Sequence, residues 1–190
     1  MGKISFFVGG KNMNKRTDVK KLTFAALFLA LAMVLPFLTG QIPQIGSMLC
    51  PMHIPALLCG FVCGAPWGLG VGLIAPLLRS LLFGMPALFP QATSMALELV
   101  TYGLISGLMY RLLKNVKGRE YMALIIAMVC GRVVWGFARL FFAGLSGGVF
   151  TWQAFLAGAI TTAVPGIILQ LVIIPPIVLL LAKAGLIKKA

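Results

Sequence analysis

Residues 51–103 read PMHIPALLCGFVCGAPWGLGVGLIAPLLRSLLFGMPALFPQATSMALELVTYG. This stretch contains the chain's only histidine, His53, and the only acidic residue that lies in apolar sequence, Glu98. Four of its glycines repeat at four-residue spacing: Gly60, Gly64, Gly68 and Gly72. On a helix this spacing makes a flat strip where a neighbouring backbone can approach closely, and Pro66 interrupts the strip. The stretch therefore predicts two short helices that fold back on each other, an external loop, and a helix that carries a buried acid.

The composition around this stretch is that of an integral membrane protein. Hydrophobic residues make up 61% of the 190 residues and charged residues 10%, and the mean hydropathy is +1.05, which lies outside the range of soluble domains. Residues 22–78 and 140–182 contain no Asp, Glu, Lys or Arg. Each run is too long for a single span of about 20 residues. We predict an all-α membrane domain over residues 21–190, preceded by a basic cytoplasmic tail over residues 1–20.

The apolar segments and the loops between them predict a bundle of six transmembrane helices. The expected ranges are 22–38, 53–63, 67–83, 91–113, 120–143 and 153–182. Thirteen of the 16 Lys and Arg residues lie within residues 1–21, 111–119 and 183–190. Six helices place all of these cations and both termini in the cytoplasm, as the positive-inside rule requires. Although the net charge is +13, this arrangement favours anionic headgroups of the lipid bilayer and excludes nucleic acid as the expected partner.

Three arginines lie inside apolar sequence together with Glu98: Arg79, Arg132 and Arg139. An unpaired arginine near mid-membrane costs about 2.5 to 3.5 kcal/mol, so each needs a partner, a cavity or an edge. Helical rise places the four residues in the outer half of the bundle or near its middle. One interpretation is structural, in which Glu98 pairs with one arginine and ties helices together. The other is that the excess positive charge binds an anionic solute from outside.

Uncharged candidates for the same ligand site lie at outer helix ends: Gln91, Gln153 and Trp152, with Trp135 between the two arginines of the fifth helix. Trp152 is equally an interfacial anchor. His53 is either an interfacial polar residue or a contact to the ligand at the rim of the site. Gln170, in the inner half of the sixth helix, is expected to make a hydrogen bond between helices.

Several function classes are excluded by the residues present. The chain has three acidic residues and one histidine. Asp18 and Glu120 are expected at cytoplasmic positions away from Glu98, and no second histidine is present to serve a metal ion or act as a general base. The cysteines, Cys50, Cys59, Cys63 and Cys130, are interpreted as small packing residues. No GxxxxGK phosphate loop is present, so the chain does not hydrolyse ATP itself. We expect no enzyme activity, no metal and no cofactor.

A family resemblance rests on two features of this sequence. Ala26 and Ala30 lie one turn apart in the first helix, and residues 54–84 read IPALLCGFVCGAPWGLGVGLIAPLLRSLLFG. Together with six spans in about 190 residues, they resemble the substrate-binding S components of energy-coupling factor (ECF) vitamin transporters, in the riboflavin and pantothenate branch. One departure is His53, where some relatives carry an acid.

This resemblance implies a multi-pass protein of the bacterial plasma membrane that binds a vitamin or related micronutrient near the outer face. It also implies that the face with Ala26 and Ala30 docks on a membrane scaffold subunit, which is coupled to two cytosolic ATPase subunits. The excess of arginine favours an anionic ligand such as pantothenate, while riboflavin, folate and a cobalamin precursor stay open. Two alternatives remain at this point: a ligand-free membrane assembly protein and a self-sufficient secondary transporter.

Overall fold

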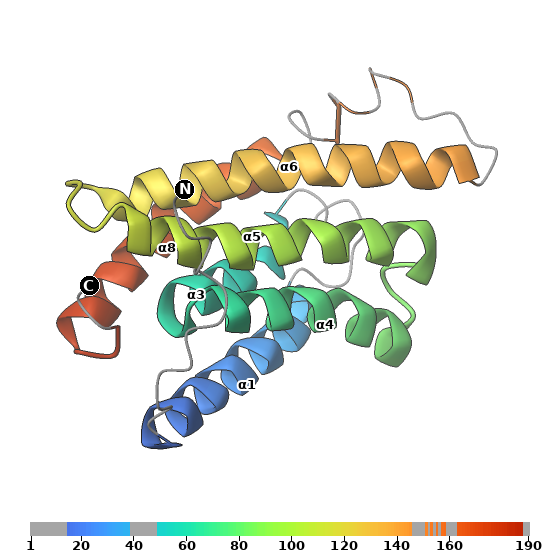
Figure 1. Ribbon diagram of the computed structural model, residues 1–190. Helices are drawn as coiled ribbons and strands as arrows, with labels where there is room; N and C mark the ends of the chain where they lie inside the picture. The colour runs from blue at the N-terminus through green and yellow to red at the C-terminus, as the bar shows by residue number, and fades with distance from the viewer. Residues whose placement is uncertain are drawn as a thin grey trace, which may run out of the picture.

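The computed structural model describes residues 15–38, 49–145 and 163–187, together with residues 151, 153, 155, 157 and 158. Within these residues the chain is all-helical and has no strand (Figure 1). The elements are α1 (Lys15–Leu38), α3 (His53–Cys63), α4 (Ala65–Phe83), the short π-helix η1 (Leu88–Ala92), α5 (Thr93–Leu112), α6 (Arg119–Leu145) and α8 (Val164–Lys183). The predicted all-α class is confirmed.

Five of these helices are long and apolar enough to cross a membrane: α1, α4, α5 together with η1, α6 and α8. The helix α3 has 11 residues, which at about 1.5 Å per residue is roughly half of a bilayer's hydrocarbon core. Ten of its 11 residues are buried among the neighbouring helices. The structure therefore provides five of the six predicted spans as long helices, and confirms that the remaining one, the second segment, is short and enclosed.

Glycines bring the backbones of α3, α4 and α5 into direct contact. A methyl group added to Gly68 of α4 would overlap the backbone of Gly103 on α5, and one added to Gly60 of α3 would meet the same carbonyl group. A methyl group on Gly72 would overlap the backbone of Leu99. The glycine strip read from the sequence is thus confirmed as a surface of close approach, and α5 is its main partner.

The predicted fold-back between the second and third segments is also confirmed. Gly64 ends α3 and precedes α4 with a φ of +96°, a conformation that glycine adopts without steric cost. Pro66 lies in the first turn of α4, where its missing N–H is not needed.

The described cations at the helix ends and in the connection between α5 and α6 gather at one end of the bundle. Figure 1 shows the start of α1, the connection between α5 and α6, and the end of α8 at the same end, opposite η1 and the end of α6. Two contacts agree with this view: Cys63 Sγ lies 3.6 Å from the carbonyl oxygen of Lys21, and the Arg111 guanidinium lies beside Gly64. The basic segments that the sequence places together are therefore neighbours in space.

Two helix starts differ from the predicted ranges. The first helix begins at Lys15 rather than residue 22, because Lys and Arg are good helix formers and Asp18 in the first turn complements the helix dipole. The last helix begins at Val164 rather than residue 153, with Pro165 in its first turn, a position that proline favours. The tail over residues 1–14, residues 39–48 and Trp152 lie outside the described residues.

Candidate functional site

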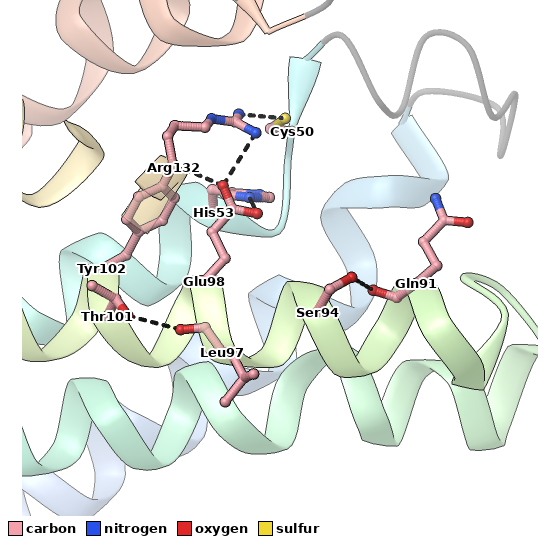
Figure 2. Close-up of polar contacts among 9 residues, drawn as sticks. All are labelled: Cys50, His53, Gln91, Ser94, Leu97, Glu98, Thr101, Tyr102 and Arg132. Atoms are coloured by element: carbon pink, nitrogen blue, oxygen red, sulfur yellow. Dashed lines mark hydrogen bonds and ion pairs between the residues drawn. The ribbon is translucent and has the colours of Figure 1, made fainter. Parts of the chain in front are cut away.

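A buried carboxylate is the centre of a polar group inside the bundle (Figure 2). Glu98 of α5 is 2% exposed. Its Oε1 accepts a hydrogen bond of 2.9 Å from the Tyr102 hydroxyl and lies 3.2 Å from Arg132 Nη1. Its Oε2 lies 3.4 Å from His53 Nε2. We call these four residues, with Cys50 beside Arg132, the Glu98 cluster.

Three helices and the segment before α3 supply these side chains. Tyr102 follows Glu98 by one helical turn, so the two share a face of α5. On α6, a methyl group at Gly131 would overlap the Tyr102 ring, so the absence of a side chain there lets α6, with Arg132, lie close to α5. His53 begins α3 and packs its ring 5.3 Å from the Tyr102 ring.

The turn that leads into α3 holds both His53 and Cys50. The backbone N–H of His53 donates a hydrogen bond of 3.0 Å to the Cys50 carbonyl. Cys50 itself has a φ of +47°, and its sulfur lies 3.7 Å from Arg132 Nη2. Cys50 is therefore not only a packing residue, because its sulfur accepts a weak hydrogen bond from the guanidinium.

The charges of Glu98 and Arg132 balance each other inside the bundle, where removing one partner leaves the other charge buried without compensation. The hydrogen bonding of the buried polar side chains is less complete than this charge balance. Within the described part of the chain, four buried side-chain nitrogen or oxygen atoms have no hydrogen-bond partner: His53 Nδ1, His53 Nε2, Arg132 Nε and Gln170 Oε1. Three of the four belong to the Glu98 cluster. Such atoms are uncommon in folded proteins, and each calls for an explanation.

Aromatic rings continue the site along α6. The Arg132 guanidinium carbon lies 6.0 Å from the Trp135 ring centre, at the outer limit of a cation–π contact. The Trp135 ring stacks on Phe155 with 6.3 Å between centroids. A methyl group on Gly158 would overlap Trp135. This close packing fixes an apolar wall beside the polar cluster.

Of the nine candidate ligand residues, Trp152 lies outside the described residues, and four of the other eight come together: His53, Glu98, Arg132 and Trp135. Arg139 lies two turns beyond Arg132 on α6 and is half-buried. Gln91 and Gln153 are exposed, and Figure 2 shows the Gln91 side chain apart from the cluster.

The structure places Arg79 elsewhere, at the contact between α1 and α4. Its Nη1 donates a hydrogen bond of 2.8 Å to the Met33 carbonyl. Its guanidinium carbon lies 5.1 Å from the Phe37 ring centre and 5.2 Å from the Phe83 ring centre. Arg79 is therefore held by a backbone oxygen and two rings, away from Glu98.

Sequence reasoning missed two members of the cluster. The position of Tyr102 one turn after Glu98 was a usable signal, whereas nothing in the sequence marks Cys50. Gln170 is buried in α8, but its Oε1 lacks the interhelical hydrogen bond predicted for it, as far as the described residues extend. In the same described part, no three His, Cys, Asp or Glu side chains come together as a metal ion would need.

The two alanines of the first helix face outward. Ala26 and Ala30 are exposed on α1, while Ala25 and Ala32 are buried against the core. The small-residue face therefore lies open on the surface of this chain.

Comparison with known proteins gives one match. The sequence model of the family described as "ECF transporter, substrate-specific component" matches residues 20–178. Comparisons with curated proteins and with solved structures gave no match.

Proposed function

This chain belongs to the family of ECF transporter substrate-specific components, and on that premise we propose that it captures a vitamin or related micronutrient from outside the cell for import. The family is one of transporters, not of enzymes. The proposed site is the Glu98 cluster with its aromatic wall at Trp135.

The observation that carries this proposal is a buried polar group whose hydrogen bonding the described residues leave incomplete. Glu98 and Arg132 both lie about 20 Å along their helices from the basic end of the bundle, by helical rise. With that end in the cytoplasm, the cluster occupies the outer half of a hydrocarbon core of about 30 Å. A ligand that arrives from outside therefore meets the Glu98 cluster before the inner half of the bundle.

Import then needs partners with an energy source. We propose that the exposed face of α1 with Ala26 and Ala30 docks on a membrane scaffold subunit, and that two cytosolic ATPase subunits complete the transporter. Small exposed residues let a second helix approach closely in a membrane. The setting is the bacterial plasma membrane.

The preference for an anionic ligand such as pantothenate stays a prediction. Glu98 already balances Arg132 at 3.2 Å, so the excess positive charge read from the sequence is smaller at this cluster. Arg139, two turns along α6, is the remaining positive candidate for an acidic group of the ligand.

The experiment is thermal unfolding of the purified protein in detergent against B vitamins and their precursors. A ligand at 100 times its dissociation constant adds about 2.7 kcal/mol to the stability of the folded state, so one compound is expected to raise the melting temperature clearly. A folded protein that no compound stabilises would favour the ligand-free assembly protein. Uptake in cells without the ATPase subunits would favour the secondary transporter.

The docking face is tested separately with bulky substitutions. Ala30→Trp is expected to abolish co-purification with the scaffold subunit, because a large side chain keeps the two helices apart. Val129→Trp is the matched control, since Val129 is also exposed but lies on α6. Equal retention of the scaffold by both variants would show that the alanine face is not the docking surface.

A further inference from the structure

The turn between α5 and α6 exposes two cations that the described protein leaves unpaired. Lys114 and Lys117 are both exposed, and neither forms an ion pair with an acid among the residues that the structure describes. The acid closest to them in the sequence, Glu120, is buried and its Oε1 lies 3.4 Å from Arg119 Nε. It therefore serves Arg119 and does not neutralise the two lysines.

The same short segment also exposes apolar side chains. Leu112 at the end of α5 is 58% exposed, Val116 in the turn 44% and Tyr121 near the start of α6 45%. Tyrosine is a residue that membrane–water interfaces favour. An anion dissolved in water would contact only the lysines, whereas a phospholipid brings acyl chains to the apolar side chains as well as a phosphate to the cations.

The backbone that carries the two lysines is fixed by contacts within the protein. Arg119 Nη2 donates a hydrogen bond of 3.0 Å to the Tyr110 hydroxyl, and the guanidinium carbon lies 4.2 Å from the centre of that ring. The Val116 N–H donates to the Leu113 carbonyl at 2.9 Å. Gly118 follows with a φ of +76°. Because the turn is already ordered, a partner that binds there has less ordering to impose.

We propose that the turn between α5 and α6 binds an anionic phospholipid of the inner leaflet. Lys114 and Lys117 donate hydrogen bonds to its phosphate oxygens, and its acyl chains pack against Leu112 and Val116. The leaflet follows from placing the basic end of the bundle in the cytoplasm. This site is separate from the Glu98 cluster and does not depend on the proposed function. A bound lipid would hold α5 and α6 together at their inner ends.

The test begins with lipids that differ in charge. Purified protein in neutral detergent is titrated with phosphatidylglycerol, with phosphatidylcholine of the same acyl chains, and with glycerophosphoglycerol, which is the anionic headgroup without chains. Only phosphatidylglycerol is expected to raise the melting temperature, because a ligand that binds the folded state stabilises it. An equal rise with phosphatidylcholine, or an equal rise with glycerophosphoglycerol at the same concentration, would overturn the proposal.

A double variant then tests the turn itself. Lys114→Gln with Lys117→Gln is expected to need roughly tenfold or more phosphatidylglycerol for the half-maximal rise, since each lysine near an anionic membrane surface contributes about fivefold to binding. Without added lipid the variant is expected to melt with the wild type, because neither lysine has an ion-pair partner among the described residues.

Lys20→Gln with Lys183→Gln is the matched control. It removes the same charge from exposed positions at the same end of the bundle, on α1 and α8 (Figure 1), and is expected to bind phosphatidylglycerol nearly as the wild type does. Equal weakening in the two double variants would show that the whole basic end attracts the lipid, and would overturn a site in the turn. The screen for vitamin binding has no bearing on this result, so the two proposals fail separately.

Discussion

Arg79 and Arg132 are both arginines inside the bundle, yet their surroundings differ. Arg132 lies against the carboxylate of Glu98 and the sulfur of Cys50, and its Nε has no hydrogen-bond partner within the described residues. Arg79 has no acid among its described contacts. It donates to the Met33 carbonyl and packs against the rings of Phe37 and Phe83.

The difference separates a structural arginine from a candidate ligand contact. No atom of Arg79 is among the buried unpartnered atoms found in the described part of the chain, and its described contacts come from α1 and α4. Burial of a charge alone therefore does not identify a site. Hydrogen-bonding capacity that the surrounding residues leave unused is the more informative sign.

The largest effect is expected from removing the acid next to Arg132. Glu98→Leu leaves a buried arginine without compensation, which typically destabilises a protein by about 3 to 5 kcal/mol. The measurement is the melting temperature of the purified protein in detergent. The double variant Glu98→Leu with Arg132→Met is expected to recover most of this loss, because it removes both charges. A double variant as unstable as Glu98→Leu would show that the uncompensated charge of Arg132 does not cause the loss of stability.

A smaller effect is expected at the other arginine. Arg79→Met keeps the length of the side chain but removes the bond to Met33 and the contacts with the two rings, and we expect a loss of about 1 to 3 kcal/mol. Ligand binding is expected to stay unchanged. Lys114→Met, an exposed substitution in the loop after α5, is the control for loss of a cation. Loss of ligand binding in Arg79→Met would show that Arg79 is not purely structural, and would contradict the distinction drawn between Arg79 and Arg132.

The smallest effect is expected from one hydroxyl of the cluster. Tyr102→Phe removes the 2.9 Å hydrogen bond to Glu98 and leaves the ring in place, for a loss of about 1 kcal/mol. Tyr121→Phe on the exposed face of α6 is the control and should not change the melting temperature. Equal behaviour of the two variants would mean that the Tyr102 hydroxyl adds nothing to what Arg132 and His53 already give the carboxylate.

Local patterns in the sequence predicted much of the fold. The spacing of Gly60, Gly68 and Gly72 predicted backbone contact because small residues allow close packing whatever the partner helix is. The fold-back at Gly64 and Pro66 followed from residues whose backbone preferences are strong. The start of the last helix was wrong because the long apolar run over residues 140–182 hid Pro165, which is itself a start signal.

The choice of partner for Glu98 did not follow from the sequence. Depth estimates placed Arg79, Arg132 and Arg139 within reach, but which helix faces which depends on the rotation of each helix about its axis. That rotation is set by contacts such as Gly131 against the Tyr102 ring, between residues far apart in sequence. The φ of +47° at Cys50 depends on the surrounding fold in the same way, so its place beside Arg132 was not predictable.

The shortness of α3 has a consequence for how the protein is made. An 11-residue helix is too short to be released into lipid as a finished span, and it begins with a histidine whose partners, Glu98 and Tyr102, are synthesised about 45 residues later. During synthesis α3 therefore lacks these partners until α4 and α5 have followed it. The polar site is complete only when α6, which follows α5 in the chain, has supplied Arg132.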